Sequence, residues 1–145
     1  MRRNDYENLR PYQKFPEEKS NAGSTGIVLL LTPGKFLIAN LGDSRVLKFG
    51  KDNSILTHDF GHKPDNPSEL KRIQEAGGKV VRGRINGKLN LCRAFGDYQF
   101  KRKMDLPQES QMVSCVPEFF EGKVDGDLRF FIMGCDGIWE TKSDE

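Results

Sequence analysis

Short apolar runs separated by turn residues restrict this chain to a fold of short, mostly antiparallel strands. Ile27–Leu31 is apolar throughout, which is typical of a strand covered on both faces. Thr32–Lys35 is a Thr-Pro-Gly-Lys turn, in which proline presets one backbone dihedral and glycine supplies a positive φ. Phe36–Leu41 then predicts a second strand. The two runs therefore predict an antiparallel hairpin.

Similar sequence patterns predict further strands and one helix. Apolar or alternating runs predict strands at 46–49, 80–81, 89–91, 113–116 and 129–133, and Asn86-Gly87 is a strong hairpin signal. A helix is expected after Asn66, a good N-cap, with Glu69 reaching back as in a capping box and Gly77-Gly78 ending it. Residues 98–111 are polar and irregular, so a mobile surface loop is expected there. Many short strands with one helix favour an α+β sandwich.

Composition excludes several classes of protein. The longest apolar run has five residues, far below the roughly 20 that span a bilayer, so no membrane partner is expected. The basic start lacks the apolar segment of a secretory signal. Three cysteines without CxxC spacing predict reduced thiols in a cytoplasmic or nuclear compartment.

The charge distribution gives no case for a nucleic-acid partner. The net charge is +2, although residues 79–103 hold eight Lys or Arg against one acid. That stretch has few interleaved aromatic residues, so we expect no nucleic-acid binding. Opposite charges on two solvated faces are the simpler interpretation, and we favour it over a basic rim beside an acidic pocket.

A polar arm or linker and one folded domain are expected. Residues 1–22 are polar and contain two prolines, which predicts an arm or linker, and residues 23–145 would form the folded part. Glu145 comes soon after the last apolar strand, and Ile138 and Trp139 resemble the start of a buried helix. We therefore expect a domain truncated at both ends.

Two aspartates follow directly on strand-like runs. Asp43 lies in Gly-Asp-Ser-Arg, and Asp136 lies in Gly-Cys-Asp-Gly. Carboxylates at strand ends, flanked by glycines, suit hard divalent cations. For each pattern taken alone we favour an ordinary turn, in which aspartate bonds to nearby backbone.

Seven segments in one order resemble the metal-dependent protein phosphatase 2C (PPM-type) family of serine/threonine phosphatases. They are Gly23–Gly26, Ala39–Arg45, His62–Pro64, Glu69 with Arg72-Ile73 and Gly77-Gly78, Arg93–Asp97, Pro117-Glu118 and Phe131–Trp139. The resemblance implies two stacked antiparallel sheets flanked by helices. It also implies two or more Mg²⁺ or Mn²⁺ ions, which activate a water that attacks phosphoserine or phosphothreonine of a phosphoprotein directly.

The resemblance also assigns roles to individual residues. Asp136 matches the family's metal-bridging aspartate, and Asp43 matches an aspartate that helps hold a third, weaker metal. Glu140 stands where the family usually has aspartate. Residues 98–111 would be the flap beside the active site, whose Lys101, Arg102 and Lys103 are candidates to contact an acidic phosphopeptide. A solvated loop tip is the alternative for these three cations, and we favour it.

The family's Asp-Gly-His-Gly-Gly and Asp-Asn segments do not occur in the sequence, so one of three expected primary metal carboxylates is present. No catalytic set is complete, and we expect this polypeptide to be inactive by itself. The alternative function is a pseudophosphatase-like binding or regulatory module. Uncovered sheet edges and apolar faces also predict self-association.

Overall fold

The computed structural model describes residues 22–52, 55–58 and 62–141, with the backbone alone for 55–58. The predicted arm at 1–22 lies almost wholly outside this range. The elements, in chain order, are β1 (Gly23–Ser24), β2 (Gly26–Thr32), β3 (Lys35–Leu41), β4 (Arg45–Gly50), β5 (Ile55–His58), α2 (Pro67–Glu75), β6 (Val80–Val81), β7 (Arg84–Ile85), β8 (Phe95–Gly96), the 3₁₀ helices η3 (Tyr98–Phe100) and η4 (Gln108–Ser110), β9 (Glu118–Lys123), β10 (Leu128–Gly134) and α3 (Asp136–Trp139).

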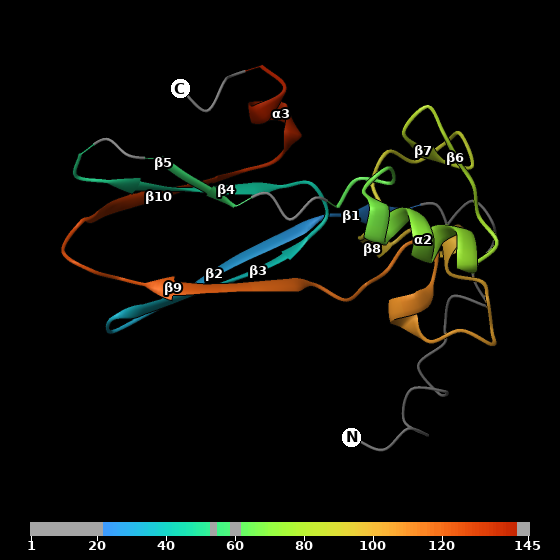
Figure 1. Cartoon of the computed structure of the whole chain (residues 1–145), viewed down its shortest axis with the longest axis horizontal. Helices are drawn as coiled ribbons and strands as arrows, with labels where there is room; N and C mark the ends of the chain where they lie inside the picture. The colour runs from blue at the N-terminus through green and yellow to red at the C-terminus, as the bar shows by residue number, and fades with distance from the viewer. Residues whose placement is uncertain (1–21, 53–54, 59–61, 142–145) are drawn as a thin grey trace.

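Two three-stranded antiparallel sheets stack as a sandwich, which confirms the predicted α+β fold (Figure 1). One sheet has the order β2-β3-β9 and the other β10-β4-β5. Phe36, Ile38 and Val46 are buried between them, and the Phe36 ring meets Phe131 edge-on at 5.1 Å between centroids. Inward-facing residues of both sheets thus form the core of the sandwich.

The first hairpin has the predicted strands, but only one face of its first strand is covered by other residues. β2 pairs with β3 from Gly26 opposite Leu41 to Thr32 opposite Lys35, around the expected turn. β2 is an edge strand, and the side chains of Val28 and Leu30 are 63% and 53% exposed. The expectation of cover on both faces was wrong because only the inward face of this strand meets the second sheet.

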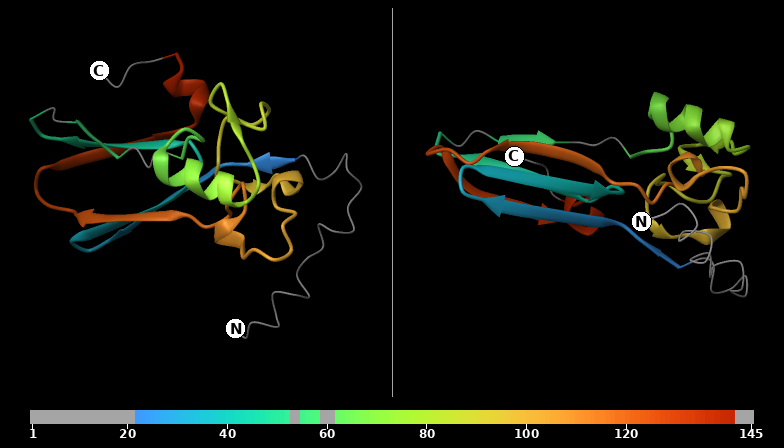
Figure 2. Two further views of the ribbon diagram at one scale, coloured as in Figure 1. Left: turned by 45° about the vertical axis from the view of Figure 1, so that its right-hand side comes forward. Right: turned by 90° about the horizontal axis from the view of Figure 1, so that it is seen from below.

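The elements between residues 62 and 114 form a second lobe at one end of the sandwich, here called the α2 lobe (Figure 2). Its core consists of the buried residues Ile73, Ile85, Cys92, Ala94, Phe100 and Val113. The predicted helix is present, and the Ser68 amide donates to the Asn66 carboxamide at 3.1 Å. Glu69 makes no capping box, since its carboxylate bonds to arginines and a thiol instead.

Several predicted strands are shorter in the structure. Asn86 and Gly87 form the expected turn with φ of 52° and 73°, but the returning strand is a single bridge between Ile85 and Leu89. The run at 113–116 contributes one bridge, from Ser114 to Arg93. β5 and β9 were not predicted. β9 lacks a long apolar run because its two phenylalanines lie between Glu118 and Glu121.

The predicted mobile loop at 98–111 is anchored. Phe100, Lys101 and Gln111 are buried, and the Gln111 carboxamide donates to the backbone of Lys103 and Leu106 at 2.6 and 2.8 Å. Near the end of the chain, Trp139 is half-buried and donates to Gly134 at 2.7 Å. In the described part of the chain, no helix has the length and hydrophobicity needed to cross a bilayer.

Candidate metal site and its supporting network

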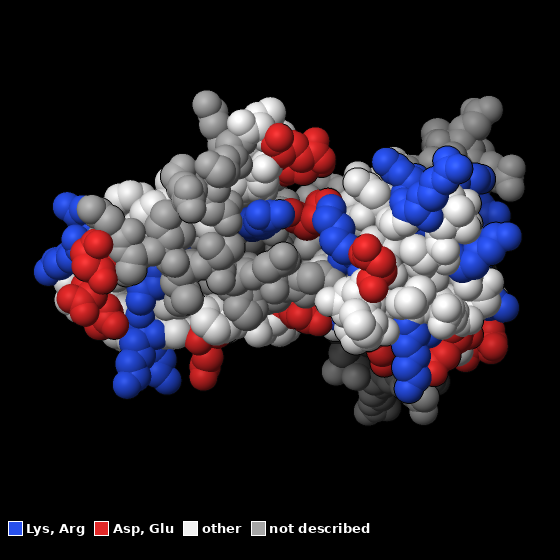
Figure 3. Space-filling model, turned by 45° about the horizontal axis from the view of Figure 1, so that its top comes forward, with Lys and Arg blue, Asp and Glu red and all other residues white. Residues whose placement is uncertain are grey.

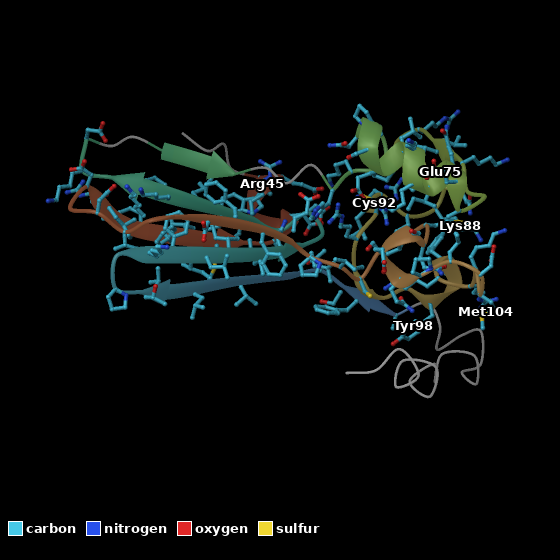
Figure 4. The ribbon with its side chains drawn as sticks, turned by 60° about the horizontal axis from the view of Figure 1, so that its bottom comes forward. Arg45, Glu75, Lys88, Cys92, Tyr98 and Met104 are labelled. Carbon is cyan, nitrogen blue, oxygen red and sulfur yellow. The ribbon has the colours of Figure 1, made fainter. Side chains whose placement is uncertain are left out.

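The two candidate metal carboxylates leave the same end of one strand pair. Arg45, the first residue of β4, pairs with Gly134, the last residue of β10. Asp43 precedes Arg45 by two residues, and Asp136 follows Gly134 by two. Figure 4 places Arg45 at the end of the sandwich that faces the α2 lobe. The antiparallel register therefore brings both aspartates to the seam between the two lobes.

The loop that carries Asp43 requires a glycine before it. Gly42 has a φ of 106°, and a Cβ there would lie 2.4 Å from the Thr25 side chain. Its carbonyl accepts a hydrogen bond from the buried Asn40 carboxamide at 3.0 Å. This fixed turn leaves the Asp43 side chain only 12% exposed, with its Oδ2 atom 2.5 Å from the Lys63 ammonium.

The buried side chain of His62 holds this loop in position. Its fully buried imidazole places Nδ1 3.1 Å from the Gly42 amide nitrogen and 3.0 Å from the Gly42 carbonyl oxygen. Nε2 lies 3.6 Å from a carboxylate oxygen of Glu118 on β9. The His62 ring therefore joins the Asp43 loop to the other sheet.

A buried ion-pair network continues from Glu118 into the α2 lobe. The Arg93 guanidinium donates to Glu118 at 2.5 Å and to Glu69 at 2.6 and 3.2 Å. Glu69, whose side chain is 4% exposed, also accepts from Arg72 and from the Cys92 thiol. This network, formed by His62, Glu118, Arg93, Glu69 and Arg72, ties helix α2 to the sandwich.

The electrostatics of the network follow from burial and pairing. Burial tends to raise the pKa of Glu69, but hydrogen bonds from Arg93 and Cys92 and the two arginine charges outweigh it, so the pKa lies below its ordinary value. Burial, and then the charge of Arg93, lower the pKa of His62, against the opposing effect of Glu118. Glu69 is therefore held as a carboxylate, and His62 as a neutral ring.

Figure 3 shows acidic and basic side chains together where the sandwich meets the α2 lobe. Asp136 and Glu140 are exposed at the two ends of α3. Cys135 beside them is also exposed. α3 carries the predicted Asp-Gly-Ile-Trp sequence as one short helical turn.

The three flap cations separate into two kinds. Lys101 is buried, and its ammonium donates to the Ala94 carbonyl at 2.6 Å, so it does not lie at the surface where a peptide could contact it. Burial lowers its pKa. Arg102 and Lys103 are exposed.

The donor chemistry of Asp43 and Asp136 fits a hard divalent cation, because both supply carboxylate oxygen. The Lys63 ammonium on Asp43 shows that this carboxylate attracts a cation. Among residues 22–52 and 62–141, however, no group of three or more His, Cys, Asp or Glu side chains is placed to hold a metal ion. The described residues therefore supply only part of a metal shell.

Sequence reasoning named Asp43 and Asp136 as candidate ligands but missed the network behind Asp43. Glu69 was expected to cap its helix, and Arg93 and His62 appeared only as parts of motifs. A detectable signal was available, since Glu69 lies on the same helical stripe as the apolar Ile73, four residues later. A charged residue on a buried stripe indicates a buried ion pair.

The family model described as "Protein phosphatase 2C" matches residues 1–145. Among curated relatives, human "Protein phosphatase 1G" is 41% identical over 130 residues, covering 89% of this chain and 24% of that protein. "Protein phosphatase 2C 1" of Paramecium tetraurelia is 41% identical over 134 residues, covering 92% of this chain and 44% of that protein. The chain thus spans less than half the length of these relatives.

Solved structures share the fold. "Crystal structure of serine-threonine phosphatase 2C from Toxoplasma gondii" is matched with a TM-score of 0.70 and 25% identity, over 97% of this chain and 48% of that one. "Structure of a C.elegans sex determining protein" is matched with a TM-score of 0.75 and 27% identity, over 96% of this chain and 32% of that one.

Proposed function

The chain belongs to the protein phosphatase 2C family, and from this premise we propose that it is part of a metal-dependent phosphatase that hydrolyses phosphoserine and phosphothreonine in proteins. The observation that carries the proposal is the pairing of Arg45 with Gly134. The aspartates of two separate family motifs each lie two residues beyond this pair, which supports a metal site that they share.

Asp136 would hold Mg²⁺ or Mn²⁺ at the primary centre, and Asp43 would hold a further, weaker ion. Two or more ions are expected in the intact domain, where they would supply Lewis-acid stabilisation of the phosphoryl group and an activated water. Glu140 stands where the family usually has aspartate. It carries the same charge on a longer side chain, with which it would face the third ion.

The chain's own residues would orient this chemistry. His62 and Gly42 fix the backbone under Asp43, so the carboxylate keeps its position when a cation approaches. Arg93 and Glu69 hold the α2 lobe against the sandwich. A site whose ligands are already held in position loses less free energy to reorganisation when the ion binds.

The substrate would be a phosphoprotein. Arg102 and Lys103 lie exposed on the loop between η3 and η4, where they would contact acidic residues of a phosphopeptide. A solvated loop tip remains the simpler role for both, and Lys101 is excluded as a surface contact by its burial.

A second candidate function is a non-catalytic, pseudophosphatase-like binding or regulatory module. It is favoured by one observation: in the described part of the chain no group of three potential ligands is assembled. Both functions use the same fold, and they differ in whether the natural protein turns over a phosphopeptide.

Two further expectations concern the cellular setting and self-association. The cysteines Cys92, Cys115 and Cys135 are free thiols, which supports a reducing cytoplasmic or nuclear compartment. Val28, Leu30 and Phe119 are exposed on the outer face of the β2-β3-β9 sheet, which supports self-association of the isolated polypeptide.

The test is turnover by the full-length natural protein that carries these residues, with a phosphothreonine peptide and Mn²⁺. Asp136→Asn should lower kcat by about 1000-fold, because a primary metal ligand contributes several kcal/mol to the transition state. Glu121→Gln removes an exposed carboxylate of β9 and should leave kcat unchanged. Turnover that survives Asp136→Asn would contradict the proposed centre, and a natural protein without turnover would favour the binding module.

A further inference from the structure

We propose that Lys63 is a resident counter-ion of Asp43 that a divalent cation must displace in order to bind there. This inference rests on the proposed function, because it concerns the weaker metal site. It assigns a role to a lysine that the proposed chemistry does not otherwise use.

The first support is the contact itself. The Lys63 ammonium lies 2.5 Å from Asp43 Oδ2, and the Asp43 side chain is 12% exposed. An ion pair in this partly buried position is screened less by water than a surface pair. An ammonium on Oδ2 uses the same oxygen that a divalent cation would take.

The second support is the way the contact is built into the backbone. His62, next to Lys63 in sequence, bonds to Gly42, which is next to Asp43. The two contacts therefore form adjacent links between the same two segments. Because the first link holds the segments together, little chain entropy is lost when the second one forms.

The third support is the exposure of the lysine. The Lys63 side chain is 48% exposed, so its ammonium can swing into water without unfolding its surroundings. His62 keeps the loop in place when the lysine leaves, because its ring is fully buried. Removal of the lysine charge should therefore free the carboxylate while its position is kept.

The test measures Mn²⁺ binding to the full-length natural protein by the loss of the free-ion EPR signal. Lys63→Met should tighten the ion whose binding depends on Asp43 by about fivefold, the size expected for loss of a competing ion pair of this exposure. Lys88→Met removes an equal charge on the outer side of the α2 lobe, away from the sandwich (Figure 4), and should leave the affinity unchanged. Asp43→Asn identifies the ion concerned.

A second measurement uses lysine acylation followed by mass spectrometry. Saturating Mn²⁺ should raise the labelling of Lys63 about as much as Asp43→Asn does, since both release the ammonium, while labelling of Lys88 stays constant. Unchanged or weaker Mn²⁺ binding in Lys63→Met, or Lys63 labelling that ignores Mn²⁺, would overturn the inference and leave the proposed phosphatase function standing. If Asp43→Asn removes no bound ion, both the inference and the weaker metal site fail, whereas loss of turnover in Asp136→Asn would still support the primary centre.

Discussion

Arg45 and Gly134 are paired residues at the end of the β4–β10 ladder, although 89 positions separate them in the sequence. Their pairing places Asp43 and Asp136 beyond the same end of the ladder, each two residues past the last pair. The position of both aspartates at this end of the sandwich is thus a product of strand register.

The isolated 145-residue polypeptide should show no turnover of a phosphothreonine peptide with Mn²⁺. Its described residues bring together no group of three metal ligands, and one carboxylate offers little against the cost of dehydrating a hard cation. Phosphate release, measured alongside a buffer blank, tests this. Turnover that Asp136→Asn abolishes would show that these residues assemble a working centre without others.

Glu69→Gln should lower the free energy of unfolding by about 3 kcal/mol, because it leaves buried arginine charge without its carboxylate. Glu75→Gln on the same helix is the matched control. Glu75 is 67% exposed and 3.9 Å from Lys71, so its loss should cost about 0.5 kcal/mol or less (Figure 4). Urea unfolding measures both values, and equal effects of the two variants would contradict the network.

His62 should make stability depend on pH just below neutrality. Its folded-state pKa lies below 6.5, so the unfolded chain takes up a proton that the folded protein resists. Stability is therefore full above pH 6.5 and falls as the pH drops below it, by up to about 1.4 kcal/mol per pH unit. Urea midpoints at pH 7.5 and 5.5 should show this slope, and His62→Gln should flatten it. A slope that persists in the variant would assign the effect to other groups.

Gly96→Ala should destabilise the β1–β8 pair. Gly96 has a φ of 65°, and a Cβ there would lie 2.2 Å from the Ala22 carbonyl oxygen. We expect a loss of about 2–4 kcal/mol in the free energy of unfolding. Gly126→Ala serves as control, because no atom lies within 4 Å of its added Cβ, and it should change stability by less than about 0.5 kcal/mol. Similar melting curves for both variants would contradict the assigned strain.

The isolated polypeptide should self-associate through the outer face of the β2-β3-β9 sheet. Leu30→Lys places a charge in the middle of this face and should shift sedimentation velocity profiles toward the monomer. Val81→Lys, a similar change at a 44% exposed residue of β6, should leave the profile unchanged. A wild-type polypeptide that sediments as a monomer would refute the prediction.

Local features of the sequence were sufficient to predict the first hairpin and helix α2. The turn at Thr32–Lys35 and the cap at Asn66 work through residues within a few positions of each other, so their signals survive in sequence alone. The order of the motifs also predicted the fold class.

Tertiary structure alone decided what surrounds these elements. Glu69 could have capped its own helix, but Arg93, 24 positions later, takes its carboxylate into a buried pair. Lys101 was expected at the surface and is buried against Ala94. Long-range pairing depends on which segments meet in space. The local pattern could place Glu69 on a buried stripe, but it could not identify Arg93 as the partner.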